Sequence, residues 1–163
     1  METLSQTRLH ELFTYEDGEL IWQISKGNAK AGKTAGCLNG AGYSQIQIDG
    51  QSYLTHRVVW MYIHGAWPTD QIDHINGIKT DNRINNLREC SPGENQQNRT
   101  PNKNSTSKFA GVSWFAKTKK WQARIGIQGK QKHIGYFTNE LDAAFAYLEA
   151  KLQHHKFQPI PRT

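Results

Sequence analysis

The strongest structural signal in the sequence lies in two adjacent segments, IDHINGIKTDNRINNLR at residues 72–88 and SPGENQQNR at residues 91–99. The first reads as a strand, an Asn-Gly turn and a return strand. The second begins as a helix, because Ser91 and Glu94 have the spacing of a capping box around a proline in the first helical turn. The two segments therefore predict a β-β-α unit, with Asn95 in the first turn of its helix or just beyond.

Asp73 and His74 are the residues of this unit that carry chemistry. An adjacent Asp and His on a strand, facing a polar residue of the following helix such as Asn95, can hold one divalent ion beside a general base. Phosphodiester hydrolysis needs that pairing, a hard cation for the charge on phosphate and an imidazole to take a proton from water. A lone Asp-His pair would be an ordinary surface pair, and the surrounding frame argues against that alternative.

The motifs DHING at residues 73–77 and NRINNLR at residues 82–88 resemble the HNH, or ββα-metal, nucleases of phage homing endonucleases. The resemblance implies a metal-dependent DNA endonuclease or nickase that uses Mg²⁺ or Mn²⁺. It also implies one role for each of four residues: His74 as general base, Asp73 as metal-binding carboxylate, Asn86 as the asparagine that fixes the loop by side-chain hydrogen bonds to backbone, and Asn95 as a metal ligand. Many members carry a metal-binding His at the last position, and Asn in its place disfavours zinc or nickel.

The segments before this unit predict short strands and one helix. Residues 19–22 read as a strand after an Asp-Gly turn, residues 46–54 as a hairpin around a second such turn, and residues 56–64 as a helix capped by Thr55. We interpret His56 and His64 as structural, although His56 precedes the motif closely enough to touch DNA phosphate. Asn82 and Asn85 are interpreted as turn formers.

The C-terminal part of the sequence predicts three strands followed by one helix. Residues 109–115, 121–127 and 132–137 alternate in period two, and Thr138 is a candidate N-cap for a helix over residues 139–153. Leu141, Ala144, Phe145 and Leu148 lie on one side of that helix. A three-stranded sheet backed by one helix leaves its other face open.

Charge is divided unevenly along the chain. Residues 1–100 hold 9 Lys and Arg against 11 Asp and Glu, whereas residues 101–163 hold 11 against 3. Residues 101–139 contain eight basic residues and no acidic one. A polyanion is the partner that this pattern favours, and a solvated basic face is the alternative.

Residues 108–151 resemble the DNA-binding domain of plant ethylene-response (apetala-type) transcription factors, on the motifs GVSW, WQARI, IGYF and LDAAFAY. In that fold the sheet lies in the major groove of double-stranded DNA and the helix covers its back. The expected DNA-binding residues are Ser113, Phe115, Lys117, Lys119, Lys120, Gln122, Arg124, Lys130, Gln131, Lys132 and His133. Plant sequence specificity does not transfer, because Ser113, Phe115 and Gly126 replace base-reading arginines. A sheet domain that binds protein is the alternative.

These observations predict an α+β chain of two domains. A nuclease domain spans residues 1–100, a linker without large apolar side chains spans 101–107, and a DNA-binding domain spans 108–163. A mean hydropathy of −0.75 excludes an integral membrane protein. The two cysteines exclude a four-cysteine zinc site. No secretory signal is recognisable, so we expect a cytoplasmic protein, in the bacterial host if the gene is a phage gene. We also expect a monomer, and the sequence implies no protein partner.

The leading hypothesis is a DNA endonuclease or nickase of the phage homing type with a C-terminal targeting module. The first alternative is a DNA-binding regulator whose HNH motif is inactive. The second is an RNA- or protein-binding adaptor that uses only the basic sheet, which explains neither Asp73-His74 nor Asn95.

Overall fold

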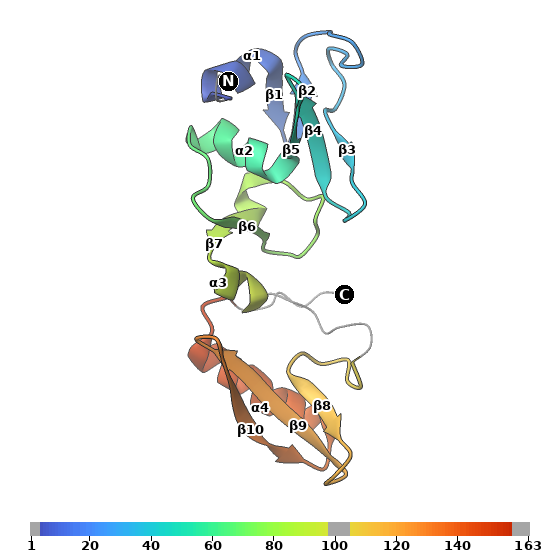
Figure 1. Cartoon of the computed structure of the whole chain (residues 1–163), viewed down its shortest axis with the longest axis vertical. Coiled ribbons are helices and arrows are strands. Elements are labelled where there is room, and N and C mark those ends of the chain that lie inside the picture. The colour runs from blue at the N-terminus through green and yellow to red at the C-terminus, as the bar shows by residue number, and fades with distance from the viewer. Residues whose placement is uncertain (1–3, 98–104, 158–163) are drawn as a thin grey trace. The chain divides into compact units, whose positions relative to one another are not determined.

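The computed structural model describes residues 4–97 and 105–157. It has the mixed α+β fold that the sequence predicts, with a three-stranded antiparallel sheet and one helix at its C-terminal end (Figure 1). The chain divides into two compact units between Cys90 and Ser91. Of the predicted linker at 101–107, residues 101–104 lie outside the described residues.

The first unit is built from two hairpins, a small sheet and two helices in its described part. Strands β1 and β2 form one antiparallel hairpin, β6 and β7 form another, and β3, β4 and β5 form the sheet. In chain order its elements are α1 (Gln6–Leu12), β1 (Phe13–Glu16), β2 (Glu19–Trp22), β3 (Cys37–Leu38), β4 (Ser44–Ile48), β5 (Gln51–Leu54), α2 (Thr55–His64), β6 (Gln71–His74), the 3₁₀ turn η1 (Ile84–Asn86) and β7 (Leu87–Cys90).

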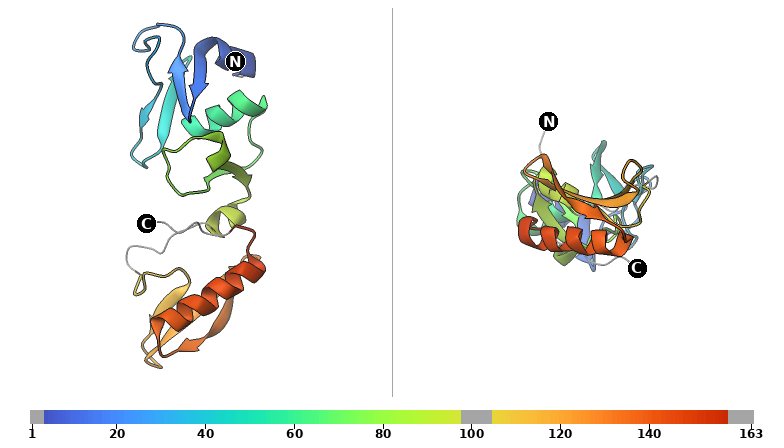
Figure 2. Two further views of the ribbon diagram at one scale, coloured as in Figure 1. Left: turned by 180° about the vertical axis from the view of Figure 1, so that it is seen from behind. Right: turned by 90° about the horizontal axis from the view of Figure 1, so that it is seen from below.

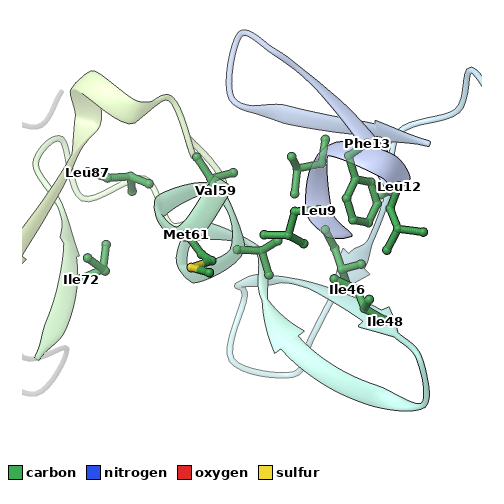
Figure 3. Close-up of a cluster of buried hydrophobic side chains, with 12 residues drawn as sticks. Leu9, Leu12, Phe13, Ile46, Ile48, Val59, Met61, Ile72 and Leu87 are labelled. Atoms are coloured by element: carbon green, nitrogen blue, oxygen red, sulfur yellow. The ribbon is translucent and has the colours of Figure 1, made fainter. Parts of the chain in front are cut away.

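Helix α2 lies in the middle of the hydrophobic core of this unit. Val58 and Val59 on α2 have no exposed surface, and neither does Phe13. Figure 3 shows the side chains of α1 and β4 meeting α2 on one side, and Ile72 and Leu87 of the β6–β7 hairpin meeting it on the other. Because one core joins them, the position of the β6–β7 hairpin is fixed by the packing of α2.

The start of α2 differs from the prediction. Thr55 is the first helical residue, Leu54 is the N-cap, and no side chain caps the helix. The Thr55 hydroxyl instead donates a hydrogen bond to Ser44 Oγ at 2.8 Å. Thr55 therefore links the helix to β4. The sequence pattern of a helix cap does not predict this contact, because Ser44 is distant in sequence.

The second unit is a three-stranded antiparallel sheet with α4 across one face (Figure 2). Its strands are ordered β10-β9-β8. Its elements are α3 (Pro92–Gln97), β8 (Val112–Phe115), β9 (Lys120–Ile127), β10 (Lys130–Phe137) and α4 (Glu140–His154). Strand β8 begins at Val112, not at Phe109 as predicted, because Gly111 adopts a φ of +72°, which ends an extended run.

Helix α4 buries only Ala144 of the four residues that the sequence pattern places on one side. Its buried side includes Ala143 and Ala144, whereas Leu141, Phe145 and Leu148 are exposed, Phe145 by 67%. Gly111 lies so close to Tyr147 that an added Cβ would overlap the Tyr147 ring. The helix and sheet approach closely, and small residues permit that approach better than the large apolar ones. The N-cap of α4 is Asn139 and not Thr138 as predicted. Asn139 Oδ1 accepts a hydrogen bond from Leu141 N at 2.9 Å.

Helix α3 belongs to the second unit by its contacts. Ser91 and Glu94 form the predicted capping box, with Ser91 N donating to Glu94 Oε2 at 3.0 Å and Glu94 N donating to Ser91 Oγ at 3.3 Å. Lys156 pairs with Glu94 at 3.1 Å, and Lys151 donates to the Gln97 carbonyl. The division of the chain therefore falls before α3, inside the span predicted as the first domain.

Candidate active site and DNA-binding face

The β6–β7 hairpin places Asp73 and His74 at the end of a buried strand. Asp73 pairs with Arg88 in the register of the hairpin, and His74 pairs with Leu87. Successive side chains of a strand point to opposite faces. The His74 side chain consequently shares the core-facing side with Ile72, and the Asp73 side chain lies on the other.

The His74 imidazole is enclosed by polar and aromatic groups. It is 5% exposed, and its Nε2 lies 3.1 Å from Asn82 Oδ1. The His56 ring of α2 meets it edge-on, with 5.0 Å between ring centroids, and the Tyr43 centroid lies 6.0 Å away. Burial lowers the pKa of His74, against the opposing effects of the Asn82 hydrogen bond and the Asp73 carboxylate. At neutral pH the imidazole is therefore uncharged and able to accept a proton.

Asn86 and Asp81 hold the loop between β6 and β7 in shape. Asn86 Oδ1 accepts from Asn76 N at 3.0 Å, and Asn86 Nδ2 donates to the Asp81 carbonyl at 2.7 Å. The Asp81 carboxylate accepts from Arg83 at 2.8 and 2.6 Å and from Asn76 Nδ2 at 2.7 Å. The hydrogen bond from Arg83 is the main reason that the pKa of Asp81 falls to about 2. The loop next to His74 is therefore held in one conformation by its own hydrogen bonds.

Asp73 is engaged by a cation of the chain itself. Its Oδ2 accepts from Arg88 Nε at 2.9 Å and from Arg88 Nη2 at 2.6 Å. Asp73 is 8% exposed, so this charge-assisted pair is largely desolvated. A metal ion bound at Asp73 would share the carboxylate with the Arg88 guanidinium or displace it.

Asn95 lies in α3, in the second unit, where it is half-buried and its backbone N donates to the Ser91 carbonyl at 2.9 Å. Asp73 and His74 belong to the first unit. Within the described part of the chain no three His, Cys, Asp or Glu side chains form a metal cluster. The Asp73 side chain has carboxylate oxygens and the Asn95 side chain has an amide oxygen. Such hard oxygen donors fit Mg²⁺ or Mn²⁺, which keep several waters, and do not fit a tetrahedral zinc site.

The open face of the C-terminal sheet carries several of the predicted DNA-binding residues. Arg124 is exposed and pairs with His133 across the sheet, and Lys120 is exposed beside Phe115. Gln122, predicted to face outward, is only 4% exposed, because its side chain lies under Tyr136 and His133. Its Nε2 is 3.1 Å from His133 Nδ1 and 3.3 Å from the Tyr136 hydroxyl. Ser113, Lys117, Lys119 and Gln131 are exposed on this face and its turns. Lys130 and Lys132 are exposed as well, but they pair with Ile127 and Ile125, so their side chains lie on the side of the sheet that α4 covers and not on the open face as predicted.

Tyr136 also lies on this face, whereas the sequence alone leaves open whether Tyr136 or Phe137 packs on the helix. A register shift between His133 and Gly135 moves Tyr136 to the open face and Phe137 into the core. The Tyr136 ring lies 5.4 Å from the Phe115 ring and 4.5 Å from the His133 ring, between centroids. A β-bulge reverses the alternation that follows it, so strict period two could not place these two residues.

Asn82 and His56 are the residues of the first unit that the sequence reasoning undervalued. Asn82 is 4% exposed and contacts His74 directly, although its sequence context is that of a turn. His56 is buried, and burial lowers its pKa to about 4, helped by His74 and Arg57. Both side chains are buried by contacts with segments that are distant in sequence. Sequence periodicity does not encode such contacts.

The segment that contains the β6–β7 hairpin is similar to a known protein family. Residues 53–97 match the HNH endonuclease family. The matched HNH segment begins in β5, contains the β6–β7 hairpin and ends with α3. The match supports a nuclease-type function.

A second similarity is to a phage protein. The chain is 35% identical over 80 residues to Protein 3.8 of Escherichia phage T7, which covers 48% of this chain and 66% of that protein. No solved structure matches the chain at a significant level. Within the described residues, no helix combines the length and apolar character that crossing a bilayer requires.

Proposed function

We propose that the protein is a metal-dependent DNA endonuclease or nickase of the phage homing type. The observation that carries the proposal is the buried His74, held by Asn82 next to Asp73, inside a segment that matches the HNH endonuclease family. An imidazole that is uncharged at neutral pH and fixed in place is suited to take a proton from water as that water attacks phosphorus.

Each residue of the site would contribute one part of the hydrolysis. His74 takes the proton of the attacking water, and Asn86 holds the loop between β6 and β7 through its hydrogen bonds to backbone. Asp73 and Asn95 would hold a Mg²⁺ or Mn²⁺ ion, which when bound supplies positive charge to the phosphate and to the leaving oxygen. Arg88 orients the Asp73 carboxylate through the two hydrogen bonds to Oδ2.

The C-terminal unit supplies DNA affinity in this proposal. Its open sheet face would bind double-stranded DNA through the exposed lysines on the turns, with Arg124 available for a base contact. Gln122 is removed from the group of expected base readers, because its amide is buried beneath two rings. The resemblance to the apetala-type domain supports this arrangement as a proposal, and so do the eight basic residues between 101 and 139.

The second candidate, a DNA-binding regulator with an inactive HNH motif, is favoured by one observation. Arg88 already satisfies Asp73 Oδ2 with two hydrogen bonds, and Asn95 is a neutral ligand. If the ion cannot compete with Arg88, the protein would bind DNA without cutting it.

Supercoiled plasmid incubated with Mg²⁺, Mn²⁺ or EDTA separates the two candidates. The proposal predicts nicked or linear DNA with either metal and intact DNA with EDTA. Asp73→Ala and Asn95→Ala should need more metal for the same rate, because each removes a ligand. Intact plasmid under all conditions, with DNA binding retained, would establish the regulator instead, and metal titrations that overlay the wild type would remove both residues from the ligand set.

A further inference from the structure

Asn82 is a buried polar residue of the first unit that has no catalytic role in the hydrolysis described above. Its side-chain oxygen lies 3.1 Å from His74 Nε2. A carboxamide oxygen only accepts hydrogen bonds, so Nε2 is the nitrogen of His74 that carries the hydrogen. In a neutral imidazole the proton-accepting lone pair then belongs to Nδ1.

We propose that Asn82 is a positioning residue that fixes His74 as the Nε2–H tautomer and directs Nδ1 to the attacking water. The consequence for catalysis rests on the proposed function of His74, whereas the tautomer itself does not. Asn82 does not touch the reacting atoms in this proposal. It acts through the ring that it holds, as the hydrogen-bonding partners of metal-bound histidines do.

The backbone around Asn82 is fixed well enough to serve this purpose. Asn82 N donates to the Thr80 carbonyl at 3.1 Å, and the neighbouring Asp81 and Arg83 form a two-point ion pair. Ile84 N donates to the Tyr15 hydroxyl at 2.9 Å, which ties the same loop to β1. The Asn82 carboxamide is therefore presented by a loop that is anchored on both sides.

The β1–β2 hairpin presses directly on this loop. Gly18, at the turn of the hairpin, has a φ of +94°, and a Cβ added there would lie 2.7 Å from Arg83 N and 3.1 Å from Asn82 C. This contact leaves the loop no room to move toward the hairpin. Residues 13–22 lie outside the segment that matches the HNH family, so the positioning of His74 depends on a part of the chain that precedes that segment.

His56 limits the ring of His74 from α2. The two rings meet at 83°, with 5.0 Å between centroids, and the Tyr43 ring lies against both, 5.5 Å from His56 and 6.0 Å from His74. A flip of the His74 ring about its χ2 angle would exchange a nitrogen and a carbon at Asn82. The edge-on contact with His56 opposes other ring positions by packing, and the Asn82 hydrogen bond selects between the two flipped orientations.

The test is the tautomer of His74, read from long-range ¹H–¹⁵N NMR spectra of the full chain labelled at histidine, with His74→Gln to assign the signal. The wild type should show the Nε2–H tautomer above the pH at which the ring is charged. Asn82→Asp keeps an acceptor and should keep this tautomer, whereas Asn82→Leu should give a mixture. Asn85→Leu, the same change at an exposed asparagine, serves as the control.

Cleavage is measured on the same proteins under single-turnover conditions. Asn82→Leu should lower the rate by about 10–100-fold, with DNA affinity unchanged, as expected for loss of an orienting partner. The Nδ1–H tautomer in the wild type would overturn the proposal even if no variant folds. So would a tautomer unchanged by Asn82→Leu. If the wild type does not cut DNA, hydrolysis by His74 is contradicted, and the tautomer still decides the role of Asn82.

Discussion

His56 and His74 face each other in the core of the first unit, and burial lowers the pKa of both. For His56 the value falls from 6.5 to about 4. A buried neutral imidazole is suited to packing, and it adds no positive charge next to the base. His56 therefore packs against His74 and does not act as a second acid or base at neutral pH.

This burial predicts how stability depends on pH. Between about pH 6.5 and pH 4 the unfolded chain binds a proton at His56 that the folded chain does not, so the free energy of unfolding decreases as the pH falls through this window. The loss should be on the order of 2–3 kcal/mol. Urea unfolding at a series of pH values measures it.

The control for that experiment is a pair of variants. His56→Gln should remove much of the pH dependence between pH 6.5 and 4, although His74 contributes a slope of the same sign. His64→Gln, at an exposed position of the same helix, should leave the dependence as in the wild type. Equal slopes in wild type and His56→Gln would show that His56 is protonated in the folded protein.

At the scale of elements, the sequence predicted most of what local pattern can encode. The hairpin turns at Asp17-Gly18 and Asp49-Gly50, the Ser91–Glu94 capping box and the three C-terminal strands could all be predicted. Each depends on residues that are close in sequence and have characteristic turn or cap chemistry.

The remaining features depend on contacts between distant segments. The sequence pattern groups Leu141 and Phe145 with Ala144 on one side of α4, but the helix packs through its alanines, because Gly111 brings the sheet close. The local sequence indicates a turn at Asn82, because nothing near it in sequence shows that its side chain is buried in contact with His74. Gln122 lies on the open face, as alternation predicts, yet the bulge in β10 brings Tyr136 over it.

The β1–β2 hairpin allows a sharp test of element packing. Gly18→Ala should destabilise the protein by about 2–4 kcal/mol, because it combines a positive φ with a close contact to the Arg83 backbone. Gly27→Ala is the matched control: Gly27 also has a positive φ, +60°, but nothing lies within 4 Å of its added Cβ. It should lose about 1 kcal/mol. Equal losses by thermal or urea unfolding would mean that the hairpin does not press on the loop.

In the proposed function, DNA cleavage and DNA affinity depend on different parts of the chain. The chemistry is assigned mainly to residues 71–95, and the basic sheet face of the second unit is assigned the binding of DNA. Such a division predicts variants that change one property and leave the other as it was.

Arg124 and Lys119 test the binding half of this division in the full chain. Arg124→Ala should reduce discrimination between preferred and random duplex sites by about 1–3 kcal/mol, because a guanidinium on this face can pair with guanine. Lys119→Ala, on a turn, should weaken binding to all sequences alike and lower the salt slope by about 0.9, the value for one phosphate contact. A uniform loss in Arg124→Ala, with site preference intact, would make Arg124 another phosphate contact.

The most direct measurement of the central claim is the single-turnover cleavage rate of His74→Ala on duplex DNA in Mg²⁺, together with its DNA affinity. If His74 is the general base, the rate should fall by about 10²–10⁴-fold, the usual size of general-base catalysis, with the dissociation constant nearly unchanged. A wild-type rate in His74→Ala would show that His74 is not the general base.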